Sequence, residues 1–456
     1  MVTGSLLLII FILSLLALFL LILGFKWDAY LALLVVAVGT GIAVGIPLAE
    51  VPQIITTGFG NTLAGVGILI GLGIMLGQLM EVSGAIHKIA HTLLRIAGPK
   101  NSSLAVATTG LIVGIPLFFD AAFVILNGLI KNLSVKAKVS YTTLVLALAV
   151  GLITAYCLII PTPAPLAVAD SIGVDLGYFF IYGLIVGITG VFFGGYIYGL
   201  WLNRKGDANR VIEETLSRLA AAQELDSHEE HFTKEVSAFI SFGVLALPIL
   251  LIVLNTIFSL VSPGTAITSF FSFAGEKNMA LLISVIFAAI VLKPYLKVPA
   301  QEAYFEAFKS SGLIMLITGA GGAFGGVIKG SGIGDYLVDL MQGWDMPIFI
   351  LAFIFAQILR VALGSSTVSL ITTSSILGPM ILDLGVSPIL LALAICAGGI
   401  GLSMPNDSGF WVVSRFSGMT VTQTLKTWSI GGFIAGVSAL VMVYILSLGS
   451  GFLPGL

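Results

Sequence analysis

Charge is scarce in this chain. Only 9% of its 456 residues are Asp, Glu, Lys or Arg, whereas a soluble protein carries roughly 25%. Hydrophobic residues make up 58% of the chain. The net charge of −2 excludes the strongly basic balance that is typical of nucleic-acid-binding proteins. These absences predict a polytopic membrane protein with no nucleic-acid partner.

Cysteine and histidine are also rare. Cys157 and Cys396 lie in apolar runs, so we expect small core residues rather than a disulfide or metal site. His87 and His91 have i, i+4 spacing, but no acidic or cysteine cluster accompanies them, which favours a surface position over a zinc site. The chain has neither a nucleophile–base pair nor a Gly-Lys-Ser/Thr phosphate loop. We therefore expect no enzyme, no ATP hydrolysis and no cofactor.

Long apolar segments dominate the chain. A helix needs about 20 apolar residues to cross a bilayer. The segment 5–25 lacks the basic start and cleavage site of a signal peptide, so we expect it to be retained. The only long polar segment, 203–236, predicts a cytoplasmic loop. The expected spans are 5–25, 29–46, 61–84, 140–160, 177–201, 238–260, 279–296, 311–328, 388–403 and 428–448.

Two apolar stretches, 102–130 and 347–385, do not fit simple spans. The first is interrupted by GIPLFFD at 114–120, and the second by ALGSSTVS at 362–369. The apolar arms beside these interruptions are too short to cross a bilayer alone. Each stretch therefore predicts a re-entrant hairpin, which enters and leaves the membrane on one side.

The distribution of basic residues agrees with two hairpins. Lys and Arg are enriched in cytoplasmic loops. If the hairpins enter from opposite sides, only Lys277, Lys329 and Arg360 fall outside the cytoplasmic side. In this topology both termini are external.

Prolines interrupt the chain at a third point. Pro161, Pro163 and Pro165 fall within CLIIPTPAPLAV, and proline lacks the N–H that continues a helix. We expect a helix break at 161–165. A second break is expected at 404–409, within MPNDSGFW.

The two halves of the chain share this order of elements. GIMLGQLMEVSG at 73–84 aligns with GGAFGGVIKGSG at 321–332, and each block precedes a hairpin and then a broken helix. Opposite entry of matching elements predicts an inverted repeat. The matched residues, all offset by 248, are Gly73, Gly77, Ser83 and Gly84 with Gly321, Gly325, Ser331 and Gly332.

Irregular backbone persists at membrane depth only inside protein or beside a wet cavity. If the four interruptions meet, they form one polar pocket, and half-helix N-termini pointing into it favour an anion. Hydroxyl and amide groups there suit a polyhydroxylated ligand. The polar side chains at the interruptions are Asp120, Thr162, Ser365, Ser366, Thr367, Asn406, Asp407 and Ser408.

Three charged residues in these regions are unusual. A carboxylate at the bilayer centre costs about 2.5–3.5 kcal/mol, which makes Asp120 and Asp407 candidates for proton or ion coupling. They can equally be helix caps. Arg360 can pair a substrate carboxylate, pair one of these aspartates, or reach an interface.

Five blocks resemble the gluconate permease family of bacterial symporters, within a larger ion-transporter superfamily. The similarity extends from about residue 30 to 440. The blocks are GQLMEVSGAIHKIA (77–90), GIPLFFDAAFVIL (114–126), PTPAPLAVA (161–169), LRVALGSSTVSLITT (359–373) and NDSGFWVVSRFSG (406–418).

The resemblance implies a fold and a mechanism. It implies scaffold helices at 1–60 and 237–299, and a homodimer. It also implies a transport domain built from two repeats, 61–202 and 300–450, which moves as an elevator.

The resemblance also implies site residues. It places site residues at Asp120, Thr162, Ser365, Ser366, Thr367, Asn406 and Asp407. We expect substrate contacts at Thr162, Pro163, Ser365, Ser366, Thr367, Asn406 and Ser408, coupling at Asp120 and Asp407, and no metal. Thr162 stands at a position where many members have a histidine. Tyr156 stands at a second position, where some members have a histidine. Histidine titrates near neutral pH, so its replacement bears on both specificity and proton coupling.

We therefore expect proton-coupled uptake of gluconate or a related small hydroxylated carboxylate, across a bacterial inner membrane. The alternatives are a sodium-coupled carboxylate symporter and a cation/proton exchanger.

Overall fold

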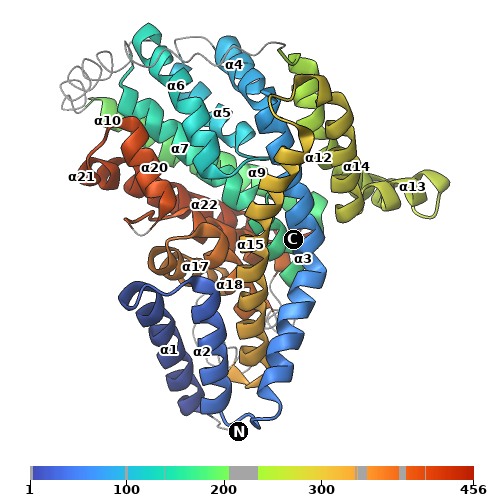
Figure 1. The fold of residues 1–456 in the computed structure, drawn as a ribbon, viewed down its shortest axis with the longest axis vertical. Coiled ribbons are helices and arrows are strands. Elements are labelled where there is room, and N and C mark those ends of the chain that lie inside the picture. The colour runs from blue at the N-terminus through green and yellow to red at the C-terminus, as the bar shows by residue number, and fades with distance from the viewer. Residues whose placement is uncertain are drawn as a thin grey trace.

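A computed structural model describes residues 4–97, 101–137, 139–204, 235–333, 336, 347–378, 387–405 and 407–456. Every regular element in these ranges is a helix (Figure 1). Nearly all of the 203–236 loop, the end of the 347–385 stretch and Asn406 lie outside the described residues.

The described first half of the chain contains one helix of 32 residues, α3, and shorter helices on either side of it. In order they are α1 (Ser5–Phe19), the π-helix η1 (Leu20–Gly24), α2 (Ala29–Ala43), α3 (Val51–Val82), α4 (Ala85–Ala97), α5 (Ser102–Val113), α6 (Phe119–Ala137), α7 (Tyr141–Leu158), α8 (Pro163–Ile172), α9 (Leu176–Gly190), the π-helix η3 (Val191–Ile197) and α10 (Tyr198–Arg204).

The second half has the same mixture of lengths. Its helices are α12 (Ala238–Val261), α13 (Ala266–Ala274), α14 (Lys277–Val291), the 3-10 helix η4 (Lys293–Tyr295), α15 (Ala300–Gly330), α17 (Ile348–Leu363), α18 (Ser366–Leu377), α19 (Pro388–Ile400), α20 (Ser408–Ser417), α21 (Val421–Thr424), the π-helix η6 (Leu425–Ser429) and α22 (Ile430–Leu448).

Five helical segments of the described chain are long and apolar enough to cross a membrane, or seven if two bent helix pairs are each one span. The sequence predicts ten spans, and only some of these correspond to helices that are long enough to cross a membrane. Some expected spans fold into shorter apolar helices, such as α2 with 15 residues and α19 with 13. The fold is that of an all-helical, multi-span membrane protein.

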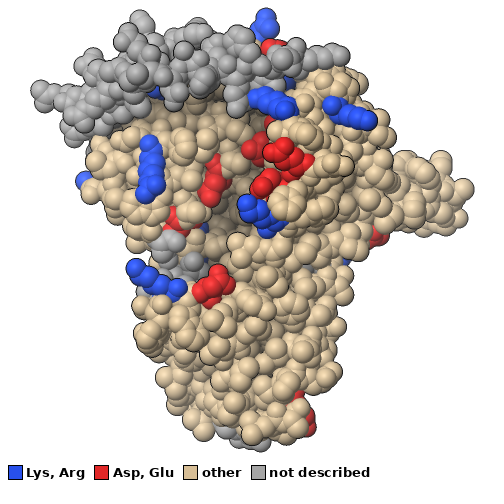
Figure 2. All heavy atoms as spheres, in the orientation of Figure 1, with Lys and Arg blue, Asp and Glu red and all other residues tan. Residues whose placement is uncertain are grey.

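The surface agrees with a membrane environment. Figure 2 shows that the lower part of this face, where α1 and α2 lie, carries almost no charge, while acidic and basic side chains gather above it. Large apolar side chains are exposed on α1, including Leu13 at 57% and Leu16 at 55%. Such exposure suits contact with lipid rather than water.

The longest helices, α3 and α15, pack against each other along the molecule (Figure 1). They are antiparallel, because Gly330 lies opposite Ile54 whereas Gly322 lies opposite Thr62. A methyl group on Gly58 would come within 2.5 Å of the Gly322 carbonyl oxygen. Small residues thus let the two backbones approach closely, as is usual between membrane helices.

The aligned segments at the ends of α3 and α15 have the same local structure. Ser83 and Ser331 cap these helices, and the following glycines, Gly84 and Gly332, have positive φ angles of 77° and 72°. The Ser83 hydroxyl donates to Met80 O at 3.2 Å, and the Ser331 hydroxyl donates to Ile328 O at 2.8 Å. The alignment at offset 248 therefore joins equivalent structural positions.

The aligned glycines also have equivalent surroundings. A methyl group on Gly77 would lie 1.9 Å from Pro116 O, and one on Gly325 would lie 2.6 Å from Ser375 O. Each glycine thus lets its long helix touch the backbone of an interrupted stretch, α5–α6 or α17–α18.

The helix breaks lie near the expected positions but differ in detail. The sequence predicts a helix break at 161–165. Pro163 and Pro165 instead lie in the first turn of α8, so they begin a helix rather than interrupt one. The first N–H groups of a helix have no partner within it, so proline is tolerated there. The break is at 159–162, between α7 and α8.

The other interruptions are also displaced. The second break covers 401–407 rather than 404–409, because α20 begins at Ser408. The interruptions of the two apolar stretches cover 114–118 and 364–365, so Asp120 lies inside α6. The helix α3 extends through residue 60, where the expected domain boundary lies, and the division of the chain into domains stays a prediction.

The crossing of α3 and α15 predicts a selective effect of two glycine substitutions. Gly58→Ala should destabilise the protein by about 1–3 kcal/mol, because its methyl group overlaps the α15 backbone. Gly60→Ala, on the same helix, meets nothing within 4 Å and should keep or slightly raise stability, because alanine favours a helix more than glycine does. Thermal unfolding in detergent measures both, and equal midpoints for the two variants would contradict this packing.

Candidate functional site

A cavity of about 120 Å³ lies where three of the four interruptions meet. It is lined by the starts of α6, α18 and α20, by α7, and by the end of α17 and η6. Asp120 is half-buried and Ser408 is exposed, so the cavity opens to solvent on this side. The lining residues are Phe118, Phe119, Asp120, Ile153, Tyr156, Arg360, Gly364, Ser365, Ser366, Thr367, Asp407, Ser408, Gly409 and Trp428.

Three helix N-termini end at this cavity. The first-turn residues Asp120 of α6, Ser366 of α18 and Gly409 of α20 all line it. The first N–H groups of a helix have no carbonyl partner within it, which gives each helix N-terminus a partial positive charge of roughly half an elementary charge. The backbone around the cavity therefore favours negative charge inside it.

Asp407 is fully engaged in the structure. Its Oδ2 accepts from Arg360 Nη2 at 2.5 Å and from the Ser403 hydroxyl, and its Oδ1 accepts from the Gly409 N–H at 3.0 Å. The side chains of Arg360 and Asp407 are 2% and 9% exposed. Asp407 is thus both the N-cap of α20 and half of a buried ion pair, one of the arrangements anticipated for Arg360.

Asp120 has a different environment. Its Oδ2 accepts from the Ser408 hydroxyl at 2.9 Å, and no ion pair to it occurs within the described ranges. It lies inside the first turn of α6 rather than at the cap position. The capping interpretation therefore fits Asp407 and not Asp120.

The hydroxyl groups of the α17–α18 segment hold it in position. Ser365 accepts from the Val368 N–H at 3.4 Å and so caps α18, while the Ser366 hydroxyl donates to Gly399 O at 2.9 Å. The Thr367 hydroxyl lies 2.5 Å from that of Tyr156 on α7. All three side chains line the cavity, as expected, but each already has a partner.

Thr162 and Pro163 are not in this cavity. They line a second cavity of about 10 Å³, together with residues of α3 and of the 114–118 interruption. The Thr162 hydroxyl donates to Ile159 O in its own break. The expectation that all four interruptions form one pocket is therefore wrong at this position, because Tyr156 and Phe118 stand between the two cavities.

The sequence interpretation missed the aromatic side of the cavity. The rings of Phe119 and Trp428 are stacked, with centroids 5.2 Å apart. Phe119 directly precedes Asp120, so the GIPLFFD block contained a signal for it, whereas a lone tryptophan near a span resembles an ordinary interface residue. The Nε and Nη1 groups of Arg360 and the Trp428 N–H are buried without a hydrogen-bond partner among the described residues.

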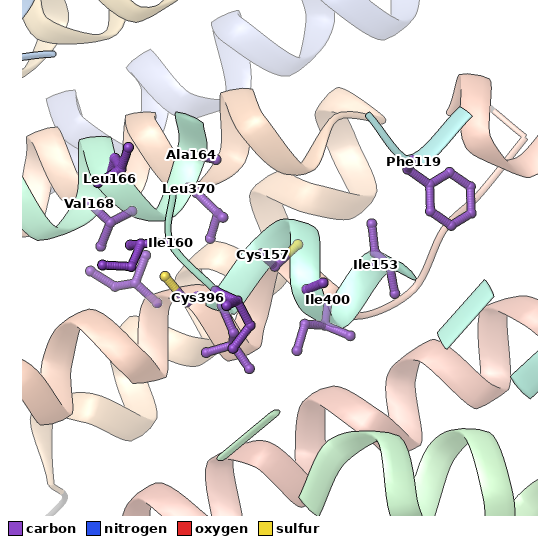
Figure 3. Close-up of a cluster of buried hydrophobic side chains, with 14 of the residues drawn as sticks. Phe119, Ile153, Cys157, Ile160, Ala164, Leu166, Val168, Leu370, Cys396 and Ile400 are labelled. Carbon is purple, nitrogen blue, oxygen red and sulfur yellow. The ribbon is translucent and has the colours of Figure 1, made fainter. Parts of the chain in front are cut away.

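Behind the cavity lies an apolar core. Figure 3 shows Cys157 of α7 and Cys396 of α19 among aliphatic side chains, with Phe119 at the edge of the cluster. Both cysteines are free and fully buried, which confirms the expectation of small core residues. No group of three His, Cys, Asp or Glu side chains in the described chain is arranged to hold a metal ion.

An all-helical membrane fold with a charged cavity between broken helices is typical of membrane transporters. The comparison with known families makes this specific. The sequence model of the GntP family permeases matches residues 6–449. The chain belongs to the GntP family and is a multi-pass membrane permease.

Individual relatives are similar along nearly the whole chain. The gluconate permease of Bacillus subtilis (strain 168) is 31% identical over 450 residues, which cover 97% of this chain and 99% of that one. The inner membrane permease YgbN of Escherichia coli (strain K12) is 31% identical over 434 residues, covering 94% and 95%. The crystal structure of the YdaH transporter of Alcanivorax borkumensis is similar in fold, with a TM-score of 0.64 at 14% identity over 89% of this chain and 90% of that one.

The Arg360–Asp407 pair predicts strongly non-additive substitutions. Arg360→Gln leaves the buried Asp407 carboxylate without a counter-charge and should destabilise the protein by about 3–5 kcal/mol. The double variant Arg360→Gln/Asp407→Asn has no unpaired charge and should be more stable than Arg360→Gln alone. Thermal unfolding of the wild type, Arg360→Gln, Asp407→Asn and the double variant measures the coupling.

An exposed arginine of α20 is the matched control. Arg415→Gln should change stability by no more than about 1 kcal/mol, because Arg415 is exposed and, among the described residues, loses only a cation–π contact with Trp411. If the two single substitutions at 360 and 407 simply added in the double variant, the pair would have no energetic role.

Proposed function

We propose that this permease takes up gluconate or a related small hydroxylated carboxylate together with protons, across a bacterial inner membrane. The observation that carries the proposal is the charge balance of the cavity. With Asp120 and Asp407 ionised and Arg360 protonated, the three side chains sum to −1, and an anionic substrate would bring the total to −2. Uncompensated buried charge costs several kcal/mol, so an anion enters more readily with a cation.

Asp120 is the group we assign to that cation. Asp407 already shares its charge with Arg360, whereas Asp120 has one hydroxyl partner, Ser408. When an anionic substrate is bound, a proton on Asp120 returns the summed charge of the cavity from −2 to −1. The three helix N-termini then stabilise the substrate carboxylate.

The unpaired donors support an oxygen-rich substrate. Buried N–H groups without partners are uncommon in proteins. Those of Arg360 and Trp428 belong to residues that line the cavity. Carboxylate and hydroxyl oxygens of a sugar acid are acceptors for such groups. The named function of relatives such as the Bacillus subtilis gluconate permease supports the same substrate class.

Sodium is the second candidate for the coupling ion. Na⁺, like other hard cations, is bound through oxygen, and the Asp120 carboxylate and Ser408 hydroxyl supply oxygen atoms at one point. Uptake measured with and without a proton gradient, and with sodium replaced by choline, separates the two ions.

Uptake into proteoliposomes tests this proposal. Labelled gluconate should accumulate when an inward proton gradient is imposed, and replacing sodium with choline at fixed pH should have no effect. Asp120→Asn should still bind gluconate but lose gradient-driven accumulation, because an amide cannot exchange the proton.

A matched control removes a carboxylate elsewhere. Glu302→Gln, at an exposed position in the first turn of α15, should accumulate gluconate as the wild type does. Accumulation by Asp120→Asn at the wild-type level would exclude Asp120 as the proton carrier. Accumulation that follows sodium instead of the proton gradient would identify sodium as the coupling ion.

We further propose that the two halves form an inverted repeat and that the transport domain moves as an elevator against the scaffold helices. The antiparallel packing of α3 and α15 and their equivalent caps support the repeat. An ion pair between Asp170 of α8 and Lys277 of α14 bridges the two proposed domains, 61–202 and 237–299. The homodimer stays a prediction.

Cross-linking of this bridge tests the motion. In the double variant Asp170→Cys/Lys277→Cys, oxidation should stop uptake while gluconate binding persists, because the domains cannot slide; reduction should restore uptake. The native cysteines are fully buried and do not compete. Oxidised Asp170→Cys alone is the control, and uptake by the cross-linked protein at the uncross-linked rate would argue against an elevator between these elements.

A further inference from the structure

Two cavities of very different size lie on either side of one pair of aromatic side chains. Among the described residues, only Tyr156 and Phe118 line both the 120 Å³ cavity and the 10 Å³ cavity. The ring centroids of Tyr156 and Phe118 are 6.3 Å apart and their planes are tilted by 51°. The pair therefore forms a partition between the two spaces.

The partition is held in place from a distant part of the chain. Tyr156 lies in the last turn of α7, directly before the 159–162 break, and its hydroxyl lies 2.5 Å from that of Thr367 in the first turn of α18. This hydrogen bond joins residues 211 positions apart. The backbone of α7 holds one end of the Tyr156 side chain and the hydrogen bond to Thr367 holds the other, so the ring has few accessible rotamers. The ring therefore forms the end wall of the larger cavity.

The space behind the partition is small and mostly apolar. It is lined by Ile74 and Leu76 of α3, by Leu117, and by the break residues Thr162 and Pro163. Thr162 is 2% exposed, and its hydroxyl is occupied by Ile159 O. A ligand in the larger cavity therefore meets the Tyr156 ring before it can reach this space.

We propose that Tyr156 sets the length of the substrate that the site accepts. With tyrosine at this position, the carbon chain of the substrate must end in front of the ring. Without the ring, the larger cavity joins the space beside Thr162, and longer acids fit. This inference rests on the proposed function, and it makes Tyr156 a specificity-determining residue whose effect is separable from the chemistry of coupling.

Two substitutions separate the ring from its hydroxyl. Tyr156→Phe keeps the partition and removes only the hydrogen bond to Thr367, so it should keep the wild-type order of preference. Tyr156→Ala removes the partition. In a hydrophobic pocket one carbon changes discrimination by about tenfold or more, and a change of this size is expected for Tyr156→Ala.

The first experiment measures inhibition of labelled gluconate binding by threonate, xylonate, gluconate and glucoheptonate. In Tyr156→Ala the preference for glucoheptonate over gluconate should rise by about tenfold or more relative to wild type, whereas Tyr156→Phe should keep the wild-type ratio. An unchanged ratio in a folded Tyr156→Ala protein would overturn the proposal. Failure of the wild type to bind any of these acids would instead refute the proposed substrate class.

The second experiment needs no sugar acid. A Thr162→Cys reporter places a thiol behind the partition, and the native Cys157 and Cys396 are fully buried. Methyl methanethiosulfonate should leave the reporter unmodified when Tyr156 is present and modify it in the Tyr156→Ala background, as measured by mass spectrometry. Equal modification in both backgrounds would show that the ring does not separate the two spaces, and would overturn the proposal whatever the substrate is.

Discussion

The buried ion pair between Arg360 and Asp407 is the contact on which the geometry of the cavity depends. It joins the last turn of α17 to the start of α20, and the Ser403 hydroxyl and the Gly409 N–H bind the same carboxylate. A buried pair contributes little net stability, because desolvation of the two charges offsets their attraction. Its effect here is to fix two interrupted elements relative to each other at the point where a ligand would enter.

The polar groups around the cavity divide into two sets. The hydroxyls of Ser365, Ser366 and Thr367 bind other protein groups and so determine the position of α18. Within the described residues, Asp120 has one hydrogen-bond partner, and the N–H groups of Arg360 Nε, Arg360 Nη1 and Trp428 have none. A ligand would therefore interact mainly with the second set, while the first set determines the shape of the cavity. Substitutions in the two sets should have different consequences for binding and for stability.

Much of this arrangement was predictable from the sequence. Membrane spans follow from long apolar segments, and the helix breaks follow from proline, glycine and polar residues that a bilayer does not tolerate without protein around them. The pairing of Arg360 with Asp407 was one of three foreseen possibilities, since a buried charge requires a partner. The aligned Ser83 and Ser331 proved to be equivalent caps because a Ser-Gly pair ends a helix by local interactions alone.

Other features depend on packing between distant segments and were not predictable. Thr162 was grouped with the other polar break residues, but the Tyr156 ring separates it from them, and ring orientation is set by contacts with Phe118 and Thr367. Trp428 reaches the cavity from a segment more than two hundred residues beyond its stacking partner Phe119. The end of the 159–162 break depends on Pro163 lying at the first position of α8, and composition does not reveal that.

The convergence of three helix N-termini on the cavity has a consequence for how such a site changes over evolution. The positive potential at a helix N-terminus comes from backbone N–H groups and not from side chains. No single substitution removes it, and it does not titrate. A descendant that keeps the breaks keeps the preference for negative charge, whatever residues line the space. Selectivity among anions can then diverge through side chains such as Tyr156 and Trp428, while the sign of the charge that is attracted is inherited with the fold.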